Sequence, residues 1–281
     1  MAVPMREIVG SSSPRRIYEF GDKLAQKLET NDKAKREGRE RSGKISGGKL
    51  GKPTLWVVLD LLGVPDKEYE AYMLGKFQRG NDVEARAIDF LTGIDASKVK
   101  DGTVVESEEG AILQGKFILQ KEGGYRGGVG FIDMAQLIEK GQIYHEIKSS
   151  TKMAYDKVAG TGRSSKSDPA PYYHHELQLA YYCIGDKVDM GFLHYFNADD
   201  YRLCSFSINP LDYKEEIDKE IDDIEACFAL KQLPPFEGFL PYHKIKAYWS
   251  YAEWNELSPS EMMNKLRSEF PASYKKLMGE N

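Results

Sequence analysis

The segment from residue 131 to residue 150 constrains the fold more than any other part of this 281-residue chain. Its halves, residues 131–138 and 143–150, are rich in apolar and β-prone residues, and the polar stretch between them contains a glycine. This pattern predicts a β-hairpin. A two-residue turn at Lys140 and Gly141 would suit the glycine and would pair Glu139 with Gln142.

The same register brings three charged residues to one face of the hairpin. It pairs Ala135 with Glu146 and Asp133 with Lys148. Cross-strand partners share a face, and alternation along the strand keeps Glu146 and Lys148 on the same side. Two carboxylates and an ammonium on one face can form a metal site. A surface hairpin with scattered charges would show the same E-x-K pattern, so the flanking segments decide between the two interpretations.

A carboxylate lies in the apolar stripe of the helix predicted over residues 76–91. The stripe consists of Gly80, Glu84, Ala87, Ile88 and Leu91. Burying Glu84 is costly unless the carboxylate has a partner. A metal ion is one candidate partner, and a salt bridge to Arg79 or Arg86 is the alternative.

A second helix is predicted over residues 174–184, with Gln178 and Tyr182 one turn apart beside its apolar stripe. An amide and a phenol in these positions could hold a catalytic lysine or contact a nucleic-acid backbone. Ordinary packing at the helix edge is the alternative.

In this order, the motifs resemble the PD-(D/E)xK nuclease superfamily, and within it the RecB-like branch that includes phage-type exonucleases. The matching motifs are Gly80 to Glu84 (G-x-x-x-E), Gly130 to Asp133 (G-x-x-D), Glu146 to Lys148 (E-x-K) and Gln178 to Tyr182 (Q-x-x-x-Y). The resemblance covers roughly residues 45–209, including an opening segment at 45–50 and a predicted helix at 54–62. It implies a restriction-endonuclease-like α/β core, in which a central mixed β-sheet is flanked by α-helices, with extra N- and C-terminal helices.

The resemblance also implies a metal-dependent DNA nuclease that hydrolyses phosphodiester bonds, and specifically an exonuclease of recombination, repair or phage DNA processing. A structure- or sequence-specific endonuclease on the same fold is one alternative, and a non-catalytic nucleic-acid-binding protein is another. The implied partner is DNA, either single-stranded or with free ends. A helicase, a recombinase or a single-strand-binding protein would be natural associates.

Mg²⁺ or Mn²⁺, as one or two ions, suits a site built from hard oxygen ligands. The expected ligands are Asp133, Glu146, Glu84 and the carbonyl of Ile147. Lys148 would orient the attacking water, offset charge on the phosphate or act as a general base. Gln178 and Tyr182 complete the expected catalytic group.

Further side chains are expected to contact the substrate. Residues 157–171 are rich in Gly, Ser and Pro, which predicts a loop, and Arg163 and Lys166 within it could bind phosphates. Lys152 ends a polar run after the catalytic strand. His175 precedes Gln178 by three residues, although a hydrogen-bonded structural histidine is an equal alternative.

Two other metal chemistries fit the sequence poorly. An iron–sulfur cluster needs four thiolates, and the chain has only Cys183, Cys204 and Cys227, without a C-x-x-C pair. Zinc would have to use histidines such as His145, which is expected to face away from Glu146. No H-E-x-x-H or Cys/His spacing is present.

The remaining segments outline the chain. Strands are predicted at residues 190–198 and 202–208, and an amphipathic helix at 211–230. Residues 244–281 should form one or two helices whose aromatic residues pack on the core, namely Tyr248, Trp249, Tyr251 and Trp254. These predictions divide the chain into a basic helical appendage (1–44), the nuclease core (45–232) and a C-terminal helical extension (233–281).

Charge and hydropathy bear on nucleic-acid binding and on the location of the protein. The formal charge of −5 does not itself favour nucleic-acid binding, but basic residues cluster locally at 33–44. The N-terminus lacks a cationic region followed by an apolar stretch, and no segment has the length of a membrane span. We therefore expect a cytoplasmic protein of a prokaryotic cell or phage-infected host, not a secreted one.

Overall fold

A computed structural model describes residues 18–37, 43–65, 70–161, 168–239 and 251–280. The chain divides into two compact units, one formed by residues 1–40 and 68–78 and the other by residues 41–67 and 79–281. In the first unit, the described elements are helix α2 (Tyr18–Glu37) and the start of helix α4 (Ala71–Thr92). The backbone N–H of Ala71 donates a hydrogen bond to Glu29 there, at 3.2 Å. The second unit holds all the strands.

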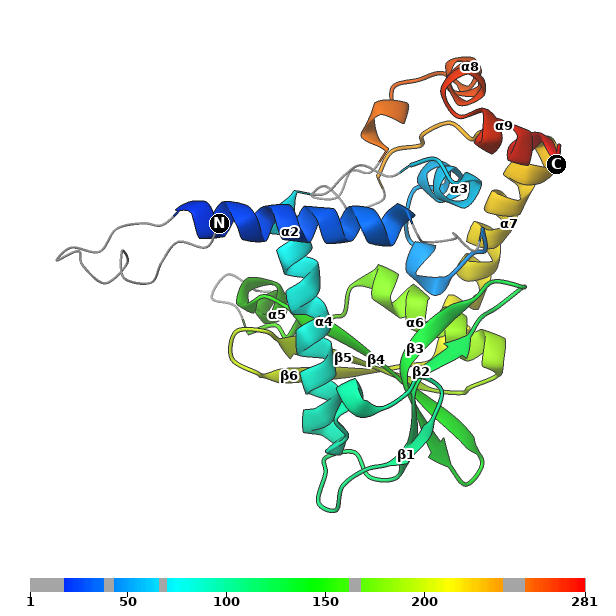
Figure 1. The fold of residues 1–281 in the computed structure, drawn as a ribbon. Helices are drawn as coiled ribbons and strands as arrows, with labels where there is room; N and C mark the ends of the chain where they lie inside the picture. The colour runs from blue at the N-terminus through cyan, green and yellow to red at the C-terminus, as the bar shows by residue number, and fades with distance from the viewer. Residues whose placement is uncertain (1–17, 38–42, 66–69, 162–167, 240–250, 281) are drawn as a thin grey trace, which may run out of the picture. The chain divides into compact units, whose positions relative to one another are not determined.

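The second unit is built on a six-stranded mixed sheet with the order β1-β2-β3-β4-β5-β6 (Figure 1). Its strands are β1 (Val104–Glu106), β2 (Lys116–Gly123), β3 (Gly130–Ile138), β4 (Gly141–Ser150), β5 (Gly191–Asn197) and β6 (Leu203–Ile208). Every neighbouring pair is antiparallel except β4 and β5, which run parallel. A parallel pair needs a long crossover, and helices α5 (Lys152–Val158) and α6 (Tyr173–Asp186) supply it. The mixed α/β fold class predicted from the sequence is confirmed.

The β3–β4 hairpin is confirmed, but the predicted register is wrong by two residues. Glu139 and Lys140 form the turn, so Leu137 pairs with Gln142, and Ala135 pairs with Tyr144 instead of Glu146. The reason lies at the glycine. Gly141 adopts a φ of +119°, a conformation that residues other than glycine rarely adopt. It follows the turn instead of forming part of it. A shift of two residues preserves the alternation, so Glu146 and Lys148 remain on the same side of β4.

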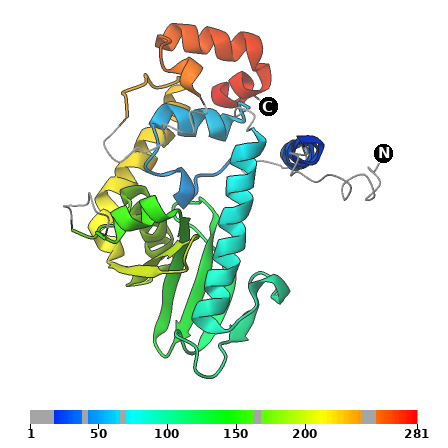
Figure 2. The ribbon, with the colours of Figure 1, turned by 90° about the vertical axis from the view of Figure 1, so that its left-hand side faces the viewer.

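Helices cover both faces of the sheet (Figure 2). From Arg79 onward, α4 packs on one face, where its buried Val83, Ala87 and Leu91 share a core with strand residues such as Met134. On the other face lie α6 and α7 (Lys214–Leu230), whose core includes Leu177, Tyr181 and Ile217. The predicted helices and strands of this core are confirmed. Strands β1 and β2 were not foreseen.

A further apolar core joins the C-terminal helices to the helix α3 (Thr54–Leu62), whose bounds match the prediction. Helices α8 (Pro259–Glu269) and α9 (Pro271–Met278) contribute buried residues to it. Ser258 and Glu261 form a capping box that starts α8. Tyr251 and Trp254 are buried here, which confirms the predicted packing for these two aromatics, whereas Tyr248 and Trp249 lie outside the described residues.

Short 3-10 turns link the main elements and complete the described secondary structure. They are η1 (Gly47–Lys49), η2 (Ala96–Lys98), η3 (Pro210–Tyr213) and η5 (Ala252–Trp254). The loop predicted from residue 157 begins later, because α5 continues to Val158. Among the described helices, none combines the length and apolar character that crossing a membrane requires.

Candidate active site

The strand β4 carries a buried ion pair. Glu146 is 2% exposed, and the Lys148 ammonium donates a hydrogen bond to its Oε1 atom at 2.5 Å. The side-chain amide of Gln178, on α6, donates to the same oxygen at 2.6 Å. Alternation along β4 places Glu146 and Lys148 on the side of the sheet that α6 covers. Gln178 and Lys148 thus hold Glu146 from two different elements.

Asp133 lies where β3 and β4 separate. The pairing of the two strands ends at Met134 and His145, and Asp133 occupies the next position of β3. Its carboxylate takes over the role of a strand carbonyl, because Oδ2 accepts a hydrogen bond from the backbone N–H of Ile147 at 2.7 Å. The Gln120 amide, from β2, approaches its other oxygen at 3.4 Å. Asp133 is therefore bound at the fork between the two strands, next to Glu146.

Glu84 reaches the same fork from α4. It is half-buried, and its carboxyl group hydrogen-bonds to that of Asp133. The predicted alternative of an arginine partner does not describe the structure: Arg79 lies beside Asp199, and Arg86 donates to the Tyr201 hydroxyl. Three carboxyl groups and one ammonium thus converge from α4, β3 and β4.

The pKa values of this cluster are strongly displaced. Burial, helped by the nearby Glu84, raises the pKa of Asp133 to about 7, and burial together with Asp133 raises that of Glu146 to about 7. Burial likewise raises the pKa of Glu84. Burial opposes the charge of Lys148, but Glu146 and Asp133 outweigh it and raise the lysine pKa. One ammonium cannot neutralise the three carboxylates at this fork, so additional positive charge would stabilise the cluster.

One oxygen of this cluster has no partner. Glu146 Oε2 is buried and accepts no hydrogen bond from any of the described residues. A buried acceptor without a donor costs free energy. A bound cation would remove this cost. Nevertheless, within the residues that the structure describes, no three His, Cys, Asp or Glu side chains are already arranged as a metal-binding group.

Tyr182 contacts the backbone around the cluster. It is 3% exposed, burial raises its pKa, and its hydroxyl group accepts a hydrogen bond from the N–H of Gly47. A Cβ on Gly130 would overlap with this hydroxyl, and a Cβ on Gly47 would lie 2.8 Å from the backbone oxygen of Gln178. Both positions therefore require glycine, and the glycine of the G-x-x-D motif is explained by the close approach of α6.

The predicted substrate contacts are dispersed. Lys152 is exposed at the start of α5, just beyond β4. His175 is turned toward the core, where its Nδ1 atom lies 2.8 Å from the Tyr195 hydroxyl. This agrees with the alternative prediction of a hydrogen-bonded structural histidine. Arg163 and Lys166 lie outside the described residues. The backbone N–H of Ile147 serves Asp133, and its side chain is buried beneath α4.

Gln120 and Gly47 complete the site but were not predicted as part of it. Gln120 adopts a φ of +46° opposite the fork, and nothing in its local sequence marks it, since β2 itself was not foreseen. Gly47 did have a signal, because it belongs to the glycine-containing segment that resembles the opening of the RecB-like branch.

The histidines form a separate buried chain. His145 Nδ1 lies 3.0 Å from His194 Nε2, and His145 Nε2 lies 3.2 Å from the Gln136 side-chain oxygen. Burial lowers the pKa of His145 to about 3 and that of His194 to about 4. The pair is neutral and packs on the α4 side with Phe117, away from Glu146, as the alternation predicted.

No protein-family model matches the chain, and no curated protein matches it. Among solved structures, it is similar to that of SSO0001, with a TM-score of 0.39 and 18% identity, over 74% of this chain and 86% of the other. It is also similar to an alkaline exonuclease, LHK-Exo, from Laribacter hongkongensis, with a TM-score of 0.39 and 14% identity, over 72% and 93% of the two chains. The structure of LHK-Exo in complex with dAMP gives a TM-score of 0.39 and 13% identity, over 66% and 89%.

Proposed function

We propose that the chain is a metal-dependent nuclease that hydrolyses phosphodiester bonds in DNA. The observation that carries the proposal is the convergence of Glu84, Asp133, Glu146 and Lys148 at the fork between β3 and β4. Binding of a nucleic acid alone does not require buried carboxylates, which repel phosphates. Hydrolysis by a metal ion does require them, together with a positive charge near the phosphate.

The residues present fit a hard divalent cation. The donors are carboxylate oxygens, which Mg²⁺ and Mn²⁺ prefer, and Glu146 Oε2 is buried without a partner among the described residues. Glu84, Asp133 and Glu146 would hold the ion, with the Ile147 carbonyl as a further oxygen donor. When bound, the metal supplies an activated water and neutralises charge on the phosphate.

Lys148 and Gln178 have supporting roles in this proposal. The Lys148 ammonium, which lies 2.5 Å from Glu146 Oε1, would orient the attacking water, offset charge on the phosphate or act as a general base. Gln178 holds Oε1 of Glu146, and Oε2, which no described residue contacts by a hydrogen bond, would be the oxygen that binds a metal. Tyr182 acts on the backbone of Gly47 and positions the segment next to Gln178.

The experiment is a cleavage assay with end-labelled linear and covalently closed circular DNA, single- and double-stranded, in Mg²⁺, Mn²⁺ or EDTA. We expect cleavage in the presence of metal and its loss in Glu146→Gln. Glu139→Gln is the matched control, because it makes the same change at the exposed turn of the same hairpin. Cleavage that survives Glu146→Gln would overturn the proposal.

The resemblance stated from the sequence further implies an exonuclease. The circular substrate separates the two enzymatic alternatives, since an exonuclease needs an end and an endonuclease does not. Binding of DNA without cleavage under every metal would instead favour a non-catalytic nucleic-acid-binding protein.

A further inference from the structure

Ser149 is an exposed residue at the carboxyl end of β4, directly after Lys148. It lies on the side of the strand that faces α4, where Gly80 makes the closest approach: a Cβ on Gly80 would be 3.2 Å from Ser149 Oγ. A larger side chain on α4 at this point would cover the hydroxyl. Gly80 therefore leaves room at Ser149, on the side of β4 from which Glu84 of α4 reaches the proposed catalytic cluster.

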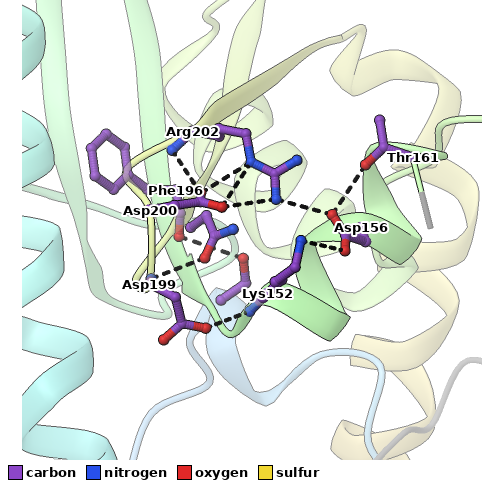
Figure 3. A network of polar contacts seen from close by, with 9 residues as sticks. Lys152, Asp156, Thr161, Phe196, Asp199, Asp200 and Arg202 are labelled. Atoms are coloured by element: carbon purple, nitrogen blue, oxygen red, sulfur yellow. Dashed lines mark hydrogen bonds and ion pairs between the residues drawn. The ribbon is translucent and has the colours of Figure 1, made fainter. Parts of the chain in front are cut away.

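Two basic residues, Arg79 and Lys152, lie near this end of β4, each in contact with Asp199. Arg79 precedes Gly80 on α4, has a side chain that is 50% exposed, and lies 3.9 Å from Asp199 Oδ1, too far for a hydrogen bond. Lys152 has a side chain that is 62% exposed, and its ammonium is 3.2 Å from Asp156. The backbone N–H of Lys152 donates to Asp199 Oδ2 at 2.8 Å (Figure 3). Asp199 thus contacts the Arg79 guanidinium and the Lys152 backbone, which places both residues at the end of β4, while the Lys152 ammonium reaches Asp156.

The existing contacts of these basic groups are weak enough to be exchanged for a phosphate. Exposed ion pairs contribute little, whereas a guanidinium or ammonium bound to a phosphate makes charge-assisted hydrogen bonds. The distance to the cluster also suits a polynucleotide. Ser149 is three residues beyond Glu146, about 10 Å along a strand, and a nucleic-acid strand presents a phosphate about every 3.4 Å along its axis.

We infer that Arg79, Ser149 and Lys152 form a second phosphate subsite, which binds a backbone phosphate of the substrate a short distance from the scissile one. The inference rests on the proposed nuclease function and deepens it, because it makes the substrate a polynucleotide chain that spans both sites. Short substrates that reach only the carboxylate cluster would bind weakly. Asp199 would oppose the anion, so it limits the affinity of the subsite.

The first test measures binding without hydrolysis, by fluorescence anisotropy of a labelled single-stranded oligonucleotide in EDTA over a series of salt concentrations. Arg79→Ala and Lys152→Ala should each raise Kd by about threefold to tenfold and lower the salt slope by about 0.7, the loss expected for one phosphate contact of a single strand. Ser149→Ala should raise Kd with no change in the slope. Lys98→Ala removes an exposed lysine from η2 and is the matched control, with no effect expected.

The second test looks for an increase in oligonucleotide affinity. Asp199→Asn removes the negative charge while keeping an oxygen that can accept the hydrogen bond from the Lys152 N–H. We expect tighter oligonucleotide binding in this variant than in the wild type. A variant that merely loosened the β5–β6 turn would not bind more tightly, and thermal melting of each variant shows whether the fold is retained.

The outcomes separate the subsite from the nuclease function. If metal-dependent cleavage is present but Arg79→Ala and Lys152→Ala leave the salt slope unchanged, the subsite is wrong and the nuclease stands. If the wild type neither binds nor cleaves DNA, the proposed function fails, and the subsite fails with it. A slope that falls equally in Lys98→Ala would show a general charge effect and would also overturn the subsite.

Discussion

Two charged clusters lie at the two ends of residues 148–152. They differ in how deeply their side chains are buried and in the ratio of acidic to basic groups. At the fork between β3 and β4, Asp133 and Glu146 are buried, and carboxylates outnumber the single ammonium of Lys148. At the end of β4, three acids and two bases contact one another nearer the surface. That surface network consists of Lys152, Asp156, Asp199, Asp200 and Arg202 (Figure 3).

The pKa values of the acidic side chains differ between the two clusters. Burial raises the pKa of Asp133 and Glu146 to about 7, although Lys148 lies beside them. In the surface network the hydrogen bonds of Arg202 lower the pKa of Asp200, and the hydrogen bonds of Lys152 and Arg202 outweigh a burial effect to lower that of Asp156. The same residue types are thus driven in opposite directions. Hydrogen bonds from Lys152 and Arg202 stabilise the surface acids as anions, whereas the buried acids need a further cation, which is the property that a metal site requires.

The largest effect is expected at Lys148. Lys148→Met should lower the rate of metal-dependent cleavage by about 10²-fold or more, because it removes the positive charge nearest Glu146 and the phosphate. Single-turnover kinetics with Mn²⁺ would measure the rate. Lys140→Met, at the exposed turn of the same hairpin, should retain it. Equal rates in the two variants would remove the functional distinction between the buried and exposed charges.

Close packing behind the buried cluster gives the next largest effect. Gly130→Ala should destabilise the fold by about 3 kcal/mol, because its Cβ would overlap with the Tyr182 hydroxyl. Urea unfolding would measure the loss. Gly48→Ala is the matched control, since no atom lies within 4 Å of its Cβ position.

A second substitution decides whether that overlap is the cause. In the double variant Gly130→Ala with Tyr182→Phe, the hydroxyl is absent, and part of the lost stability should return. An additive loss in the double variant would mean that the packing of α6 on β3 has been misjudged.

Glu220 tests how burial alone, away from the proposed catalytic cluster, affects the pKa of a carboxyl group and the stability of the fold. Its carboxylate accepts a hydrogen bond from the Gly51 N–H at 2.9 Å, yet burial raises its pKa from 4.5 to about 7. Since the folded state holds this proton more tightly than the unfolded chain, stability decreases as the pH rises from about 4.5 through 7. Glu220→Gln should therefore raise the stability by about 3 kcal/mol at alkaline pH and leave it unchanged in acid.

Urea unfolding of wild type and Glu220→Gln across this pH range would measure the difference. A variant that is stabilised equally at all pH values would contradict the linkage, because only the ionised form of Glu220 is penalised. Glu215→Gln, at an exposed position of the same helix, serves as the control.

The sequence predicted the parts of the site that depend on local periodicity. Alternation placed Glu146 and Lys148 on one side of β4, and helical spacing placed Glu84 on the apolar face of its helix, where the structure shows it half-buried. The hairpin register was wrong because it depends on the φ of Gly141, which composition does not determine. Contacts between distant segments, such as Tyr182 with Gly47 or Gln120 with Asp133, arise only when the sheet and α6 assemble.

The smallest effect is expected in the surface network, at Arg202. Its guanidinium contacts Asp200 at 3.0 Å and Asp156 at 3.1 Å, but all three side chains are accessible to water. Exposed pairs of this kind contribute little and are screened by salt. Arg202→Ala should therefore shift the urea midpoint only slightly at low salt, and the shift should vanish at about 1 M salt, where the Debye length is about 3 Å. A large loss that persists in high salt would show that this network is structural in the same sense as the buried cluster, and the contrast between the two would no longer rest on burial.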